Sequence, residues 1–261
     1  MSKAKRLWKK TQDMILSLVL GVIIIFAWQQ GGLHYILGLK PYQLSYPSDI
    51  IRTLNDDFSV IMSNTVWTLK EAVVGILVGS LIGFVIAVFA AAFPKLGVGG
   101  ISIVTAVNAI PMIAMASIMN NWFGMEMASK VAVVAVFSMA SMTLNAYRGM
   151  TELPPFSKDL MQICAARKIE TFFKLQLPNC LPYMLTALKV STTTGLMSAI
   201  CSEFFTSYKG IGYQLTASIK LSQMSVAWAY ILVATLCGVL MYAIISIIER
   251  VALKWHASQR A

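Results

Sequence analysis

Long apolar runs are the feature that most constrains this chain of 261 residues. A helix needs about 20 consecutive apolar residues to cross the hydrocarbon core of a bilayer. Backbone groups inside hydrocarbon must be hydrogen-bonded within their own segment, so we expect each run of this length to be a transmembrane helix. The predicted spans cover 14–36, 67–93, 99–119, 127–147, 184–206 and 225–248.

The composition excludes a soluble globular protein and a disordered one. Apolar residues make up 57% of the chain and charged residues only 12%, whereas charged residues are about 25% of a typical soluble domain. The mean hydropathy is +0.71, and disorder requires low hydrophobicity. The net charge of +10 is spread in short clusters rather than along one stripe, which argues against nucleic-acid binding. Isolated cysteines and histidines predict reduced thiols and no metal site.

Basic residues give the orientation in the membrane. With the N-terminus inside, 15 of the 21 Lys and Arg residues lie at the inner face, which is the asymmetry of the positive-inside rule. We therefore predict a multi-pass protein of the plasma or inner membrane with both termini cytoplasmic. The basic start followed by an apolar run resembles a signal peptide, but no A-x-A-like site follows, so an uncleaved anchor is expected. Two connections are long: 37–66, outside, with a short interfacial helix, and 148–183, inside.

The second span carries small residues at a four-residue spacing. Gly75, Gly79 and Gly83 are followed in the same row by Ala87 and Ala91. Such a row lets another helix approach closely, so that dispersion and weak hydrogen bonds hold the pair together. We interpret the three glycines as helix-packing residues, and the pattern leaves open whether the partner helix belongs to this chain or to a second copy.

Polar residues within the spans are candidates for a translocation pathway. Glu203 shares one helical face with Thr192, and an acid inside the membrane usually faces protein or water. It is either a pathway-lining or partner-pairing acid, or an interfacial carboxylate wetted at the outer leaflet. Pro111 should bend the third span, where asparagines favour a cavity wall or an interhelical hydrogen bond. The candidate pathway residues are Asn108, Pro111, Trp122, Thr192, Thr193 and Glu203.

Prolines at 154, 155, 178 and 182 bracket part of the inner segment 148–183. Because proline disfavours helix in the residue before it, we expect one or two short helices within 157–176. Basic and apolar side chains alternate there, so the piece can lie on anionic lipid or in a groove of a partner protein. The sequence has no P-loop, zinc-protease or nucleophile-elbow motif. Uphill transport would therefore draw its energy from a partner, and no enzymatic activity or cofactor of its own is expected.

Four motifs, in order along the chain, carry a resemblance to a known family. The chain resembles the inner-membrane permease subunits of binding-protein-dependent ABC transporters, in the branch that imports nitrate, sulfonates, taurine and thiamine-precursor pyrimidines. The likeness covers about 60–255. The motifs are Glu71 with Gly75, Gly79 and Gly83; Asn108 to Pro111 with Trp122-Phe123-Gly124; Cys164-Ala165-Ala166 with Leu177-Pro178; and Glu203-Phe204 with Gly210-Ile211-Gly212.

The resemblance implies a fold and partners. It implies an all-α membrane protein of the type I ABC importer class, with an N-terminal anchor and outer loop over 1–66 and a permease domain over 67–255. Its partners would be an ATPase subunit that binds the ATP, a soluble binding protein, a second permease copy and membrane lipid. A helix around 163–173 would couple the permease to the ATPase. The residues implied in coupling are Cys164, Ala165, Ala166, Arg167, Lys168 and Glu170.

The chain departs from the family pattern at two coupling positions. Cys164 stands where the family has Glu, and Glu170 where it has Gly. Because glutamate favours continued helix where glycine permits a turn, we expect a longer coupling helix. Its contacts would be made by Arg167, Lys168 and Glu170.

Two other functions remain open at this point. One is a membrane scaffold that recruits a cytoplasmic partner through 148–183 without transport, and the other is a lipid-modifying enzyme with Glu203 as base, although no second acid–base group accompanies it. If the chain is a transporter, polar and aromatic pathway residues without a buried cation favour a neutral or cationic heterocycle, such as a vitamin precursor, over a nitrate or sulfonate.

Overall fold

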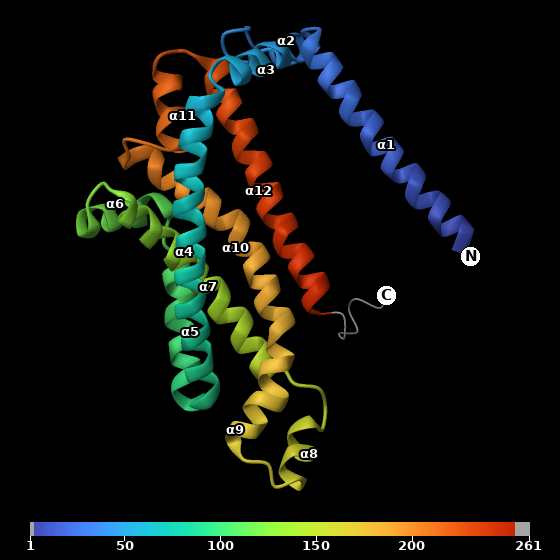
Figure 1. The fold of residues 1–261 in the computed structure, drawn as a ribbon, viewed down its shortest axis with the longest axis vertical. Helices are drawn as coiled ribbons and strands as arrows, with labels where there is room; N and C mark the ends of the chain where they lie inside the picture. Colours follow the sequence, from blue (N-terminus) through green and yellow to red (C-terminus); the bar gives the residue numbers. More distant parts are fainter. Residues whose placement is uncertain (1–2, 254–261) are drawn as a thin grey trace. The chain divides into compact units, whose positions relative to one another are not determined.

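The computed structural model describes residues 3–253, and every regular element within that range is helical (Figure 1). Contacts between residues divide the chain into two units. The smaller unit comprises Met1–Ile61 and Leu215–Leu232. The larger comprises Met62–Gln214 and Val233–Ala261. The expected all-helical class is confirmed.

The N-terminal part of the smaller unit contains α1 (Lys3–Gln29), α2 (Gly32–Leu37) and α3 (Pro47–Asp56). The first helix ends before residue 36 because Gly31, with φ of 79°, adopts the left-handed conformation that glycine tolerates. Nε2 of His34 lies 2.6 Å from the carbonyl oxygen of Leu44, which ties α2 to the following turn. The short helix expected within 37–66 is α3, which begins with proline at its first position.

Three helices form the centre of the larger unit: α4 (Phe58–Ala92), α7 (Met127–Thr151) and α10 (Leu177–Thr206). The glycine row of α4 faces α7. A Cβ added at Gly79 would lie 2.8 Å from the carbonyl carbon of Ala135 and closer still to its oxygen. The hydroxyl of Thr143 donates to the carbonyl oxygen of Gly83 at 3.1 Å. The partner helix of the glycine row therefore belongs to the same chain.

The predicted third span is two helices, α5 (Pro94–Asn108) and α6 (Met112–Phe123), which meet at 97°. The prediction of a single bent helix over 99–119 was therefore wrong. The chain leaves helical geometry between Asn108 and Met112, because Pro111 offers no N–H and disfavours helix in the residue before it. Met115, Ala116 and Met119 of α6 then pack on α7.

The remaining helices are α11 (Ile211–Lys220) and α12 (Met224–Ala252). Among the described residues, α4, α7 and α12 are each long and apolar enough to cross a membrane, and the bent α5–α6 pair makes up to four such spans. The 30-residue α10 is long enough but carries the hydroxyl-rich run 191–194, which lowers its hydropathy. Lys189 of α10 and Glu249 of α12 form an ion pair at 2.6 Å.

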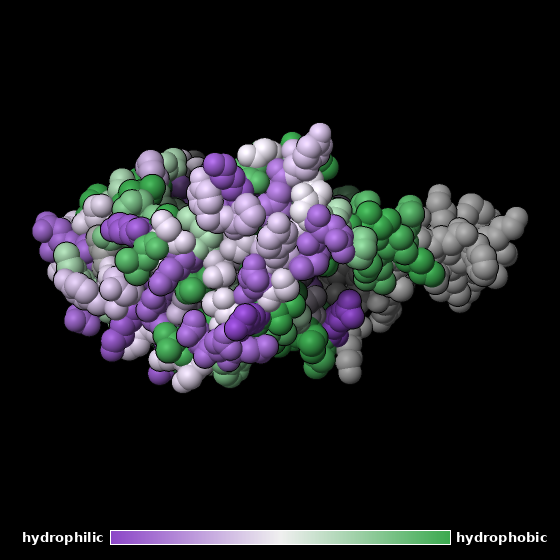
Figure 2. Space-filling view, turned by 90° about the horizontal axis from the view of Figure 1, so that it is seen from above, coloured by the Kyte–Doolittle hydropathy of each residue, from purple (hydrophilic) through white to green (hydrophobic). Residues whose placement is uncertain are grey.

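The view of Figure 2 shows a face on which hydrophilic side chains (purple) predominate, with hydrophobic ones (green) scattered among them. Charged and amide groups are costly inside hydrocarbon. Hydrophilic side chains of this kind suit regions that meet water or headgroups.

Candidate functional site

The chain reverses direction between α7 and α10 through a segment that contains α8 (Ser157–Ile163) and α9 (Lys168–Thr171). We call residues 156–173 the coupling segment. It exposes large apolar side chains: Ile163 is 82% exposed and Ile169 is 71% exposed. Phe156 and Phe173 are exposed as well. Apolar side chains gathered on a turn suit a protein partner or a membrane surface.

We expected a longer coupling helix around 163–173, but the structure has a break in this stretch. α8 ends at Ile163, and Ala165 takes φ of 49°, which turns the chain before α9 begins. Non-glycine residues adopt this left-handed conformation rarely. The expectation over 163–173 was wrong because it judged Glu170 by its helix propensity alone.

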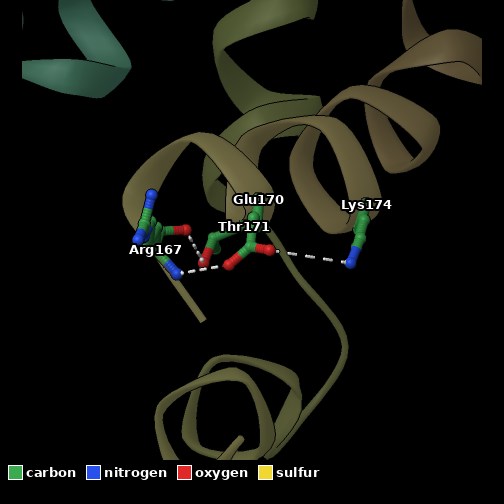
Figure 3. Close-up of polar contacts among 4 residues, drawn as sticks. All are labelled: Arg167, Glu170, Thr171 and Lys174. Carbon is green, nitrogen blue, oxygen red and sulfur yellow. Dashed lines mark hydrogen bonds and ion pairs between the residues drawn. The ribbon is translucent and has the colours of Figure 1, made fainter. Parts of the chain in front are cut away.

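Glu170 instead starts a new helix, as Figure 3 shows. Its Oε2 accepts a hydrogen bond from the backbone N–H of Arg167 at 2.8 Å. This is the reciprocal arm of a capping box, which ties the residue before a helix to the third residue inside it. Lys174 lies 3.9 Å from the other carboxylate oxygen, an exposed pair that contributes little stability. The side chain of Thr171 donates to the carbonyl oxygen of Arg167 at 3.2 Å.

The helix that begins at Lys168 does not stop at the prolines that follow. Phe172–Gln176 forms a π-turn, in which the N–H of Leu177 donates to the carbonyl oxygen of Phe172. The wider turn replaces hydrogen bonds that the nearby proline cannot make. Helix then continues through Pro178 and Pro182 along α10. The expected stop at these prolines was therefore wrong, and the coupling segment from Lys168 onward is joined to α10 by continuous helix.

Side chains also fix the base of this segment to α7. Asn179 Nδ2 donates to the carbonyl oxygen of Gly149 at 2.7 Å, and Gln176 Nε2 donates to that of Met150 at 3.3 Å. A Cβ at Gly149 would lie 2.8 Å from the Cα of Cys180, so α7 and α10 are in backbone contact here. A force on the coupling segment would therefore act directly on both helices.

The predicted pathway residues are spread over three helices. Asn108 ends α5, Pro111 precedes α6, and Trp122 is exposed near the end of α6. On α10, Thr192 is buried, whereas Thr193 lines a cavity of about 390 Å³ between α10 and α12.

Glu203 is fully buried, which excludes a carboxylate wetted at the membrane surface. It accepts a hydrogen bond from the hydroxyl of Thr68 at 2.7 Å and one from the backbone N–H of Gly212, also at 2.7 Å. The N–H of Ile211 donates to the same threonine oxygen at 2.9 Å. The N–H of Gly210 donates to Oδ1 of Asn64 at 3.0 Å. Glu203 thus fastens the turn after α10 to α4.

Two further charged side chains lie buried beside Glu203; the sequence offered Glu71 only as part of a family motif and did not single out Lys130. Glu71 of α4 and Lys130 of α7 are both fully buried, and both interact electrostatically with Glu203. The ammonium of Lys130 donates to the carbonyl oxygen of Met125 at 2.7 Å. The carboxylate oxygens of Glu71 have no hydrogen-bond partner of normal geometry among residues 3–253. Two acids and one base from three helices share one buried cluster.

These features define a class: a multi-pass helical membrane protein whose central helices connect a surface-exposed turn at one end to a buried charged cluster at the other. The model of the family described as binding-protein-dependent transport system inner membrane component matches residues 79–254. The chain belongs to this family. It is a permease subunit of a binding-protein-dependent importer, and transport, rather than a scaffold or a lipid-modifying enzyme, is its function.

Individual relatives agree with this family. The chain is 26% identical over 221 residues to the formylaminopyrimidine transport permease protein ThiX of Halalkalibacterium halodurans, covering 84% of this chain and 88% of that protein. It is 22% identical over 260 residues to the putative aliphatic sulfonates transport permease protein SsuC of Bacillus subtilis, covering 97% and 92%. An inward-facing structure of the MetNI methionine ABC transporter has a TM-score of 0.68 at 15% identity, covering 75% of this chain and 97% of that one. The fold is therefore that of ABC importer permeases.

Proposed function

We propose that the coupling segment docks in a cleft of a separate ATPase subunit and transmits its ATP-driven closure to the permease. The observation that supports this is the exposed apolar turn, since Ile163 and Ile169 lie on the segment that leads into α10, and the start of α10 is hydrogen-bonded to α7. Ala165 and Ala166 lie at the break between α8 and α9, where a small side chain allows a close approach.

The geometry also supports how the movement would travel. α10 has 30 residues and is therefore about 45 Å long at 1.5 Å per residue. One end continues into the coupling segment, and the other leads to the turn that Glu203 fastens to α4. ATP binding would bias a two-state packing of these helices by its difference in affinity for the two states.

The same proposal sets the orientation and the assembly. The coupling segment and both termini lie in the cytoplasm, as the basic residues predict. The binding protein delivers solute at the opposite face, and a second copy of the permease completes the pathway. The solute is a neutral or cationic heterocycle, in keeping with the pyrimidine named for one relative, whereas the sulfonates named for another are the competing class.

Co-purification with the ATPase tests the docking. Ile163→Asp places a charge on the exposed turn and should reduce the amount of bound ATPase at least tenfold, while the permease still folds. Ile36→Asp is the matched control, because Ile36 is similarly exposed, at 75% against 82%, but lies on α2. Normal ATPase binding by Ile163→Asp would refute the docking surface.

Thermal-shift screening of the cognate binding protein against pyrimidines, flavins and aliphatic sulfonates tests the solute class. A stabilising pyrimidine or flavin is the expected result. Stabilisation by a sulfonate alone would overturn the heterocycle assignment without affecting the ATPase docking.

A further inference from the structure

A cavity of about 130 Å³ opens at the end of the larger unit that carries the turn after α10. We call it the aromatic pocket. Three separate segments line it: α4, the connection between α6 and α7, and the turn after α10. Its principal lining residues are Trp67, Met125, Glu126, Tyr208 and Lys209.

Two of the three segments that line this pocket are held by buried side chains. The turn after α10 is fastened by Glu203 through the N–H of Gly212. The connection before α7 is fastened by Lys130, which donates to the carbonyl oxygen of Met125 at 2.7 Å. Ser129 donates to the carbonyl oxygen of Glu126 at 2.9 Å. The pocket is therefore formed before any solute arrives, which is the usual state of small-molecule sites.

Two side-chain contacts join the walls of the pocket. The ammonium of Lys209 lies 5.1 Å from the centroid of the Trp67 ring. The hydroxyl of Tyr208 contacts the sulfur of Met125 at 3.2 Å. The turn after α10 therefore contacts both of the other segments that line the pocket.

The size and chemistry of the pocket select one kind of group. A cavity of roughly 150 Å³ accepts a benzene ring, so this pocket accommodates a single ring. Trp67 and Tyr208 supply aromatic surfaces, which favour offset or edge-on contact with another ring. Lys209 donates hydrogen bonds and Glu126 accepts them. An aliphatic sulfonate can pair with Lys209 but offers no ring to Trp67 and Tyr208, so it leaves the aromatic surfaces of the pocket unused.

We propose that the aromatic pocket is an entry subsite of the permease for a planar heterocycle that carries both a ring acceptor and an amino donor. The ring lies against Trp67 and Tyr208, its acceptor faces Lys209, and its amino group faces Glu126. This assignment deepens the proposed function and rests on it, since it presumes that solute enters at this end.

Equilibrium dialysis of the purified permease in nanodiscs tests the subsite, with radiolabelled 4-aminopyrimidine as the probe and taurine as the non-aromatic comparison. Saturable binding of the pyrimidine, and weaker binding of taurine, is expected. Tyr208→Leu and Glu126→Gln should each weaken pyrimidine binding at least fivefold. Both side chains are exposed, so neither change should prevent folding.

Tyr42→Leu is the matched control, because Tyr42 is comparably exposed, at 61% against 68% for Tyr208, and also lies near a lysine ammonium. It should leave pyrimidine binding unchanged. The proposal is overturned if the native permease shows no saturable binding, or if Tyr208→Leu binds as the native protein does.

ATPase stimulation by the unliganded binding protein separates the two proposals. It should be the same in the control Tyr42→Leu as in the native complex. Loss of this stimulation in Tyr208→Leu with unchanged pyrimidine binding would assign the pocket to a side chain of the binding protein and overturn the subsite. If no ATPase binds the permease at all, the proposed function fails, whereas the dialysis result still stands.

Discussion

The close contact between α4 and α7 predicts a steep cost for one additional methyl group at Gly79. The new Cβ would lie 2.8 Å from the carbonyl carbon of Ala135. Ordinary contacts between carbon atoms are about 3.5–4.0 Å, so one helix must withdraw by roughly 1 Å. Because the obstructing atoms belong to the backbone, no side-chain rotation can relieve the clash.

The change in stability caused by Gly79→Ala is the balance of a packing cost and a gain in helix propensity. Forcing an extra methyl group into a packed interface costs about 1–3 kcal/mol, and a gap of 0.5–1 Å forfeits roughly a quarter to a half of the affected contact energy. Replacing glycine by alanine within a helix returns about 0.8–1 kcal/mol of helix propensity. We therefore expect Gly79→Ala to destabilise the protein by about 1–2 kcal/mol.

Gly99→Ala is the matched control for this prediction. Gly99 lies in α5, and a Cβ there would meet no atom within 4 Å, so the propensity effect acts alone and the variant should be slightly more stable than the native protein. Thermal unfolding of both variants in the same detergent measures the difference. Equal stability of Gly79→Ala and Gly99→Ala would refute the packing argument.

Three further outcomes are expected. Glu203→Gln keeps one acceptor oxygen for two donors, the hydroxyl of Thr68 and the N–H of Gly212. It should destabilise by about 1.5–3 kcal/mol and speed hydrogen exchange over 207–212; unchanged exchange would contradict the fastening role. Lys189→Leu leaves the carboxylate of Glu249, only 15% exposed, without its partner, and should lower the free energy of unfolding by about 1–3 kcal/mol. Adding Glu249→Leu should restore most of this stability in the same unfolding assay. A double variant that is no more stable than Lys189→Leu would contradict this prediction. Ala165→Gly should couple normally because its φ of 49° suits glycine, but Ala165→Val, which is β-branched, should lower binding-protein-stimulated ATPase activity; equal activity of the two would show that the turn is unimportant.

The sequence alone predicts the helical class and the apolar spans because both depend on local patterns. The glycine row of α4 also indicates close packing by its spacing, but not which helix it meets. Pro111 marks where helix must be interrupted, yet a single proline does not determine whether the result is a bend or a 97° junction. That angle depends on the packing of Met115 and Met119 against α7.

The candidate site was harder to predict because its conformation and contacts depend on how distant segments pack together. Ala165 has a high helix propensity, and its left-handed conformation arises from the surrounding turn. Glu71 and Lys130 lie 59 positions apart, and each alone resembles a charge near the end of a span. Only the adjacency of α4, α7 and α10 reveals that they are buried together with Glu203.

The backbone contact between α4 and α7 restricts which helices can move during transport. Sliding one helix along the other would drive the carbonyl groups near Ala135 over the larger side chains that flank Gly79 on α4. These clashes would oppose any sliding of α4 along α7 during a transport cycle. The two helices should therefore travel as one rigid body, so that any displacement that opens and closes the pathway takes place at other helix contacts.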